Sequence, residues 1–167
     1  MGQGFSIECN KCGFSFDASF GIGFMFPMES EEMIEKGRSG ELGEEVKTFL
    51  ENNKCGAIDV KRVVLRCEEC GNLEIGHDLS MYVPDDDKYD PDSEEKGIWS
   101  IAVLAEGMKY VSPMDLEEHY KKILDYPHKC SKCSGKMKII KEEEFDKIPC
   151  PECDGTMNQT DGHFYWD

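Results

Sequence analysis

The chain lacks any long apolar run, and none of its 167 residues lie in a stretch that approaches the roughly 18 apolar residues of a membrane span. Its first residues show no positively charged segment followed by an apolar run, so we expect no signal peptide. Because marks of export and membrane insertion are missing, we predict a cytoplasmic protein. In that reducing compartment, close cysteine pairs are metal ligands or redox centres more often than structural disulfides.

Apolar and basic side chains are both scarce. Hydrophobic residues make up 39% of the chain, below the roughly 45–50% of typical globular chains, a figure that also counts Gly. The 19 Lys and Arg residues stand against 35 Asp and Glu residues, which gives a net charge of −16. A single large hydrophobic core is therefore not expected. The acidic surface disfavours nucleic acids and anionic membranes, and it favours a basic protein partner.

The sequence also lacks the common catalytic patterns. No Ser, His and Asp spacing typical of a catalytic triad stands out, and there is no glycine-rich phosphate loop. The carboxylates are too numerous for one pair to be singled out as a general acid and base. These absences favour a protein that is not an enzyme.

Cysteine, by contrast, is abundant and regularly spaced. Eight of the nine cysteines form four Cys-x-x-Cys pairs: Cys9/Cys12, Cys67/Cys70, Cys130/Cys133 and Cys150/Cys153. Two cysteines at this spacing can place both sulfurs on one ion when the chain between them turns tightly. The eight thiolates are the number that two tetrahedral metal sites require. Such ions would compensate for a weak core, because binding a structural metal contributes to the free energy of folding.

The residues beside the pairs fit tight turns. Gly13 and Gly71 directly follow the first two pairs, where a left-handed backbone conformation is common and glycine adopts it without steric cost. Pro151 presets the turn of the fourth pair, and Asp154 after it is tolerated in the left-handed region. Ser134 follows the third pair, which we therefore expect to be the least regular.

This pattern resembles the zinc-ribbon superfamily, in which two cysteine knuckles on β-hairpins bind one ion. A knuckle is a Cys-x-x-Cys pair with the tight turn that contains it, and we number the four knuckles of this chain in sequence order. The resemblance covers residues 5–20, 60–80 and 128–160, and the chain is similar to small uncharacterised bacterial zinc-ribbon proteins. It implies eight metal ligands: Cys9, Cys12, Cys67 and Cys70 for one ion, and Cys130, Cys133, Cys150 and Cys153 for the other. Four knuckles allow three pairings, and we expect this sequential pairing because it closes the shortest loops.

A site of four sulfurs suits either zinc or iron. The knuckle Cys150-Pro151-Glu152-Cys153 is similar to the rubredoxin knuckle, which implies iron, but the spacer between Cys133 and Cys150 is shorter than the rubredoxin pattern. Two zinc ions are therefore favoured over iron. A closed four-thiolate site has no open position for water or substrate, so both ions are expected to be structural.

Hydrophobic periodicity predicts an α+β fold with small antiparallel sheets and a few short helices, and the resemblance implies that it contains two zinc-ribbon modules. The modules span residues 1–84, with a helical insertion at about 29–53, and residues 98–167, and residues 85–97 form an acidic linker. Helices are predicted at 30–36, 41–52 and from Ser112 to about Leu124; strands are predicted at 4–8, 57–66, 72–83, 98–104 and at Phe164-Tyr165-Trp166. The Phe-rich segment from Phe14 to Phe26 forms either the core between the ribbon sheet and the helices, which we favour, or a partner-binding face.

Three further groups of residues leave other roles open. Seven lysines near the third pair are typical of a nucleic-acid-binding zinc ribbon: Lys121, Lys122, Lys129, Lys132, Lys136, Lys138 and Lys141. His128 and His163 lie near pairs and could replace a cysteine as ligand, although eight cysteines suffice. Cys55 is the unpaired thiol, and we expect it to be a small buried residue. A rubredoxin-like iron protein or a thiol redox protein is the alternative to a structural, protein-binding module.

Overall fold

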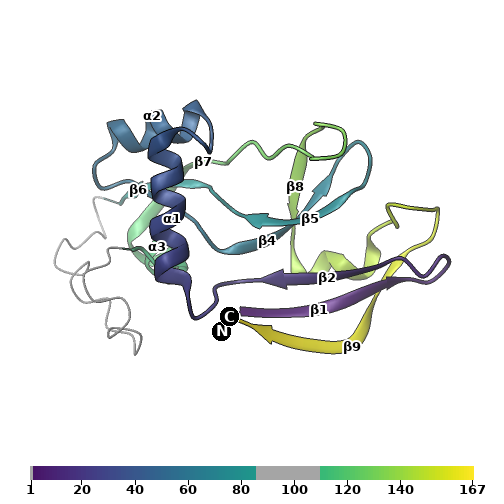
Figure 1. Ribbon diagram of the computed structural model, residues 1–167. Coiled ribbons are helices and arrows are strands. Elements are labelled where there is room, and N and C mark those ends of the chain that lie inside the picture. Colours follow the sequence, from purple (N-terminus) through teal and green to yellow (C-terminus); the bar gives the residue numbers. More distant parts are fainter. Residues whose placement is uncertain (1, 86–109) are drawn as a thin grey trace. The chain divides into compact units, whose positions relative to one another are not determined.

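A computed structural model describes residues 2–85 and 110–167; the strand predicted at 98–104 and nearly all of the predicted acidic linker lie outside them. The described chain contains three α-helices and three small antiparallel sheets, which confirms the predicted α+β class (Figure 1). Within these residues, no helix combines the length and apolar character needed to cross a membrane.

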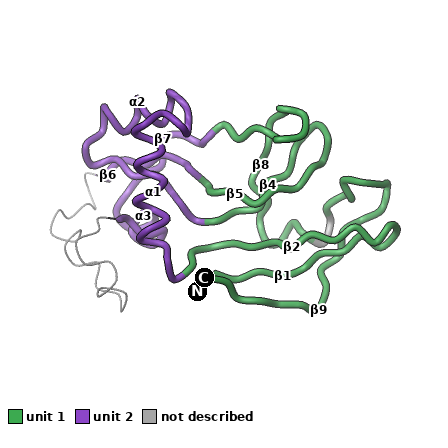
Figure 2. Tube along the Cα trace, viewed as in Figure 1, with its two compact units in different colours: residues 1–23, 62–78, 127–167 green, residues 24–61, 79–126 purple. Residues whose placement is uncertain are grey.

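The chain divides into two compact units, each assembled from segments that are far apart in sequence (Figure 2). Unit 1 comprises Met1–Gly23, Arg62–Asp78 and Pro127–Asp167, and unit 2 comprises Phe24–Lys61 and Leu79–Tyr126. All four cysteine pairs belong to unit 1. The bounds of these units differ from those of the predicted modules, residues 1–84 and 98–167. Unit 1 contains segments from both ends of the chain and from its middle.

The first sheet of unit 1 joins the two ends of the chain, with the strand order β2-β1-β9. Strands β1 (Gly2–Cys9) and β2 (Ser15–Phe20) form an antiparallel hairpin around the first knuckle, and β9 (Met157–Trp166) pairs with the other edge of β1. The strands predicted at both ends of the sequence are thereby confirmed. Since Gly2 stands opposite Trp166, the two chain ends lie side by side (Figure 1).

The second sheet of unit 1 repeats this arrangement, with the strand order β5-β4-β8. Strands β4 (Arg62–Cys67) and β5 (Leu73–His77) form a hairpin around the second knuckle. Strand β8 (Met137–Ile140) follows the third knuckle and pairs with the other edge of β4. Both sheets therefore have the same plan. Two strands form a hairpin around one knuckle, and the third strand directly follows a different knuckle later in the sequence.

One apolar core serves both sheets. Ile7 of the first sheet and Val64 of the second are completely buried in the same cluster as Phe145. Phe145 lies in the 3₁₀ helix η2 (Glu142–Lys147), and its ring centroid is 5.2 Å from that of Phe5 and 5.5 Å from that of Phe20. Both contacts are edge-on, an arrangement that aromatic rings prefer. Phe145 therefore belongs to the core cluster that residues of both sheets share.

Backbone and cation–π contacts also join the two sheets of unit 1. The N–H of Arg62 donates to the carbonyl of Gly21 at 2.8 Å, and the N–H of Gly21 donates back to Arg62 at 3.1 Å. The guanidinium of Arg62 lies 3.7 Å from the ring centroid of Trp166, within the range of a cation–π interaction. The beginning of β4 is therefore fixed to the end of β9.

The Phe-rich segment has a different role from the one predicted. Phe14, Phe16 and Phe20 pack against the core shared by the two sheets, rather than between a sheet and the helices. Phe26 is buried at the start of α1, whereas Phe24 is 43% exposed. The Phe-rich segment is therefore divided between the units. Phe14, Phe16 and Phe20 belong to unit 1, and Phe24 and Phe26 belong to unit 2.

Unit 2 contains the helices and a third sheet. Its helices are α1 (Phe26–Ser39), α2 (Glu44–Asn52) and α3 (Pro113–His119). Its sheet has the strand order β3-β6-β7, formed by β3 (Ala57–Ile58), β6 (Met81–Pro84) and β7 (Tyr120–Leu124). The first two predicted helices are confirmed in kind, with other bounds.

Two predicted strands are each broken in two where the chain passes between the units. The strand predicted at 57–66 becomes β3 and β4, and the one predicted at 72–83 becomes β5 and β6. At the second break Leu79 takes a left-handed conformation, with φ of 58°. Its N–H donates to the carbonyl of Asp59 at 2.7 Å, so the two breaks are bonded to each other within unit 2. The sequence marks these breaks only by short polar interruptions, Asp59 and Lys61 at the first and Asp78 and Ser80 at the second.

The helix predicted from Ser112 to Leu124 is correct only in its first half. The Ser112 hydroxyl accepts from the Asp115 N–H at 3.2 Å, and the Ser112 N–H donates to the Asp115 carboxylate at 3.1 Å. The chain then becomes extended at Tyr120 and pairs with β6 as β7. The helical spacing of the apolar residues gives way to tertiary pairing, which often overrides local propensity.

The position of Phe145 gives a test of the shared core. Phe145→Ala should lower the free energy of unfolding by about 3–5 kcal/mol, because it removes a fully buried ring and leaves a cavity between two sheets. Phe24→Ala is the matched control, and its cost should stay below about 1 kcal/mol because that ring is already partly in water. Urea unfolding measures both. A loss for Phe145→Ala as small as the one expected for Phe24→Ala would show that the two sheets do not depend on this ring.

Candidate metal centres

The eight paired cysteines gather their sulfur atoms in two groups of four. Site 1 consists of Cys9, Cys12, Cys150 and Cys153, and site 2 consists of Cys67, Cys70, Cys130 and Cys133. Within each group the sulfur atoms all lie within 4.8 Å of one another. The first knuckle therefore meets the fourth and the second meets the third, so the sequential pairing expected from loop length is wrong.

The strand register explains this nested pairing. Cys9 ends β1 and stands opposite Met157 at the start of β9, and Cys67 ends β4 opposite Met137 at the start of β8. In both sheets the residue after the cysteine also bonds to the residue before the methionine. The Asn10 N–H donates to Thr156 at 3.1 Å, and the Glu68 N–H donates to Lys136 at 2.9 Å. Because sheet pairing recovers many backbone hydrogen bonds and apolar contacts, it outweighs the modest entropy of closing a longer loop.

A signal for the pairing was present in the sequence. Each of the first two knuckles is followed directly by Gly, whereas each of the last two has a methionine four residues after its second cysteine. In the structure every site combines one knuckle of each kind. The glycine kind lies inside a hairpin, and the methionine kind leads into the strand that completes the sheet. This distinction excludes sequential pairing, although it does not choose between the two remaining combinations.

The short sulfur–sulfur distances in each group are close to those around a single tetrahedral ion. In site 1 the Cys9 and Cys153 sulfurs are 3.5 Å apart, and those of Cys12 and Cys150 are 3.7 Å apart. Site 2 has sulfur–sulfur distances of 3.4, 3.5 and 3.7 Å. A tetrahedron with metal–sulfur bonds of about 2.3 Å has edges of about 3.8 Å. Disulfide sulfurs lie about 2.05 Å apart, so these cysteines are free thiols.

The four knuckles share one backbone pattern. In each, the N–H of the first cysteine donates to the carbonyl five residues later: Cys9 to Phe14, Cys67 to Asn72, Cys130 to Gly135 and Cys150 to Gly155, at 2.8–2.9 Å. Gly13 and Gly71 are left-handed, as predicted, with φ of 74°. Ser134 also adopts this conformation, with φ of 60°, so the third knuckle is regular despite its sequence. The left-handed turn suggested for Asp154 is not adopted.

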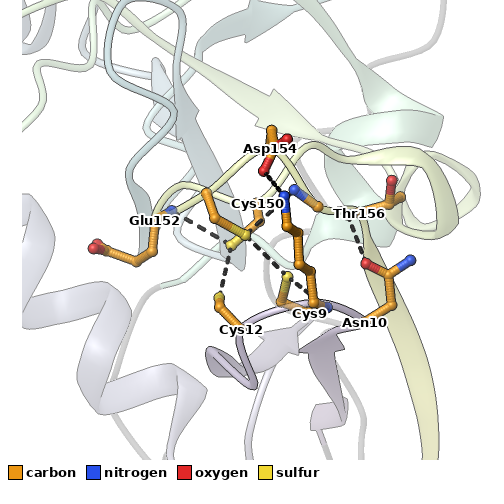
Figure 3. A network of polar contacts seen from close by, with 10 residues as sticks. Cys9, Asn10, Cys12, Cys150, Glu152, Asp154 and Thr156 are labelled. Atoms are coloured by element: carbon orange, nitrogen blue, oxygen red, sulfur yellow. Dashed lines mark hydrogen bonds and ion pairs between the residues drawn. The ribbon is translucent and has the colours of Figure 1, made fainter.

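Backbone N–H groups point at the sulfurs. The Lys11 N–H lies 3.4 Å from the sulfur of Cys9, and the Glu152 N–H lies 3.4 Å from that of Cys150 (Figure 3). The N–H groups of Cys12 and Lys11 lower the pKa of Cys9 to about 6. In site 2 the N–H of Cys70 is the main reason why the pKa of Cys67 falls to about 7. The knuckle backbone thus favours a thiolate at one cysteine of each site.

One other cysteine in each site, Cys133 or Cys153, has a raised pKa instead. The Gly135 N–H lowers the pKa of Cys133, but the nearby sulfurs of Cys67 and Cys70 raise it more, to about 12. At Cys153 the Gly155 N–H is likewise outweighed, by burial and by the other three sulfurs, and the pKa rises to about 12. Four thiolates at this distance repel one another, so they all ionise together only when a cation lies between them.

Polar side chains hold the knuckles in place around the sulfurs. At site 1 the side chain of Lys11 forms an ion pair with Asp154, and the Thr156 N–H donates to the Asn10 side chain at 3.2 Å (Figure 3). At site 2 the Glu74 carboxylate accepts from the Ser131 N–H at 3.0 Å and from its hydroxyl at 2.8 Å. Ser131 lies between the two cysteines of the third knuckle, so Glu74 fixes that turn from strand β5.

The other candidate residues lie outside the two groups. His128 is buried, and its Nε2 lies 2.9 Å from the carbonyl oxygen of Asp78. His163 lies 3.4 Å from the Gln159 side chain. Neither histidine joins a sulfur group. Cys55 is exposed, so the expectation that it is a small buried residue is wrong.

Comparison with known proteins adds no relative: no protein-family model, curated protein or solved structure matches the chain. Within the described residues, the geometry nevertheless shows two cysteine tetrads that could hold metal ions, consistent with zinc-ribbon-like knuckles.

The nested pairing is tested by removing one ligand from each site. In metal-loaded Cys153→Ser, the three remaining cysteines of site 1 should react with iodoacetamide, while all four of site 2 stay protected. Cys133→Ser is the matched variant and should give the reverse pattern. Mass spectrometry of peptides locates the alkylated residues, and the exposed Cys55 reports that the reagent is active. Reaction of Cys130 and Cys133 in the Cys153→Ser protein would contradict the nested pairing.

The Glu74 carboxylate gives a second test. Glu74→Ala should weaken metal binding at site 2 about 10–100-fold, because residues that orient ligands typically have effects of this size. Glu74→Gln keeps an acceptor oxygen for Ser131 and should recover much of the loss. Competition with a chromophoric chelator measures both sites, and site 1 serves as the internal control. An equal loss at both sites would show a general loss of stability instead.

Proposed function

We propose that each sulfur group binds one zinc ion, that both ions are structural, and that the protein is a non-enzymatic interaction or regulatory module. The observation that carries this proposal is the gathering of four sulfurs within 4.8 Å in each group. Five of the sulfur pairs are 3.4–3.7 Å apart, close to the edge of a metal–thiolate tetrahedron. The Cys-x-x-Cys spacing and the N–H groups that face the sulfurs support the same conclusion.

A structural role follows from what the sites connect. Site 1 ties residues 9–12 to residues 150–153, and site 2 ties residues 67–70 to residues 130–133. Each ion would therefore link a hairpin to the strand that completes its sheet. Because unit 1 holds both sheets, two ions there would stabilise most of its long-range pairings. A four-thiolate ion has no vacant position for substrate, which supports a role outside catalysis.

Iron is the alternative occupant that the geometry favours next. Mononuclear iron takes the same four-thiolate arrangement, and the fourth knuckle is similar in sequence to that of rubredoxins. Iron would imply electron transfer rather than a structural role. Thiol exchange is a weaker alternative, because bound metal would protect the cysteines that such chemistry requires.

The net charge of −16 supports a basic protein surface as partner, in a cytoplasmic setting. Nucleic-acid binding is the weaker proposal. Three of the seven lysines that suggested it form ion pairs: Lys122 with Asp125, Lys132 with Glu152 and Lys138 with Glu144. In addition, Lys121 and Lys122 belong to unit 2, whereas the other five belong to unit 1.

Metal analysis of protein purified without added metal tests the proposal. We expect a colourless protein with two zinc ions per chain and none of the visible absorption of iron–thiolate sites. The Cys153→Ser and Cys133→Ser variants should each retain one ion. Iron with visible absorption would replace the structural role by a redox role, and metal-free protein with native stability would contradict metal binding altogether.

The structural role has its own readout in the same samples. Removal of zinc by a chelator should abolish the hydrogen-exchange protection of strands β1 and β4, and added zinc should restore it, because metal binding and folding are coupled. Full protection in the stripped protein would show that the ions do not support the fold.

A further inference from the structure

A cavity of about 280 Å³ lies in unit 1, outside both sulfur groups. Its strand-borne lining consists of Arg66 on β4 and of Lys138 and Ile140 on β8. Arg66 and Lys138 are register partners, as are Val64 and Ile140 two residues away. Because side chains alternate along a strand, the two cations continue the same sheet face that contributes Val64 and Ile140 to the core. The cavity lies where that apolar face becomes charged.

Arg66 is the unusual group in this lining. Its Nε is buried and has no hydrogen-bond partner among residues 2–85 and 110–167, which the structure describes. A buried donor without a partner is costly, and few proteins retain one without a reason. Its Nη2 lies 3.3 Å from the position that a Cβ on Gly71 would occupy, so glycine leaves room for the guanidinium there. Arg66 therefore lines the cavity, and its Nε–H has no acceptor among the described residues.

The other charges of the cavity do not satisfy this donor. Glu144 lies 3.8 Å from the Lys138 ammonium, and its carboxylate also accepts from the Lys141 N–H at 2.9 Å. The Lys141 N–H, with the charges of Lys138 and Lys141, lowers the pKa of Glu144. That carboxylate is thus committed to the start of η2 and to Lys138. Glu143, the second acidic residue of the lining, is exposed to solvent.

The apolar part of the lining decides what kind of anion fits. Ile140 and Ile148 are buried, and Pro149 follows Ile148 at the approach to the fourth knuckle. We propose that this cavity binds a small organic carboxylate, whose oxygens accept from the Arg66 guanidinium and whose aliphatic body contacts Ile140, Ile148 and Pro149. A guanidinium matches a planar carboxylate with two parallel hydrogen bonds. Small-molecule sites combine apolar contacts with polar groups that orient the ligand, and this lining offers Ile140, Ile148 and Pro149 beside four charged side chains.

The test uses isovalerate as the probe and the metal-loaded full-length protein in a buffer free of carboxylate and phosphate. The chain has three arginines, Arg38, Arg62 and Arg66, so the Nε–Hε region of a ¹H–¹⁵N spectrum is readily assigned. We expect a saturable shift of the Arg66 Nε–Hε signal and of the Ile140 and Ile148 amides, with a millimolar dissociation constant in keeping with so small a ligand.

Matched probes and variants separate the two parts of the proposed site. Neutral isovaleramide and inorganic phosphate should each bind at least about tenfold more weakly, because one lacks the charge and the other the aliphatic body. Arg66→Gln should abolish the response of the Ile140 and Ile148 amides, whereas Arg38→Gln, which removes an exposed arginine of unit 2, should leave it unchanged.

Three results would overturn the proposal. They are an Arg66 signal that does not shift with isovalerate, an equal response to isovaleramide, and equal binding of inorganic phosphate. Since these measurements need only the folded wild-type protein, they remain decisive if Arg66→Gln fails to fold. They are also independent of which metal the two sulfur groups hold.

Discussion

The crowding of four sulfur atoms within 4.8 Å is the constraint on which the rest of unit 1 depends. Backbone N–H groups lower the pKa of one cysteine per site to about 6 or 7, but contacts with the neighbouring sulfurs and burial raise that of another to about 12. A cation between the sulfurs would let all four cysteines of a site ionise together. The strand registers, the knuckle turns and the outer hydrogen bonds all bring the sulfurs to these positions. Each of the two sulfur groups could therefore hold a thiophilic ion.

The nested pairing gives the chain its organisation. Along the sequence, the strands of the sheet β2-β1-β9 come before and after those of the sheet β5-β4-β8. Both sheets contribute residues to one core, which includes Phe145. Cys9 opposite Met157 and Cys67 opposite Met137 are equivalent positions in the two sheets. Unit 1 thus contains the same arrangement of hairpin and third strand twice. The helices of unit 2 lie in the two stretches of sequence that separate the segments of unit 1.

Much of this could be read from local sequence, and the failures share one cause. The α+β class, the terminal strands, the Ser112 cap and the involvement of eight cysteines follow from spacing and turn chemistry. The pairing of knuckles, the breaks at Leu79 and the strand at Tyr120–Leu124 depend on partners distant in sequence, which periodicity does not report. Loop entropy favoured sequential pairing, but it changes slowly with length and is overcome by strand register. The contrast between Cys-Gly knuckles and Cys-x3-Met knuckles was the available clue.

Anomalous diffraction at the zinc absorption edge tests the central claim most directly. The account predicts two peaks per chain, each about 2.3 Å from four sulfurs. One peak should lie among Cys9, Cys12, Cys150 and Cys153, and the other among Cys67, Cys70, Cys130 and Cys133. No peak at these positions, or a peak bonded to sulfurs of the first and second knuckles together, would contradict it.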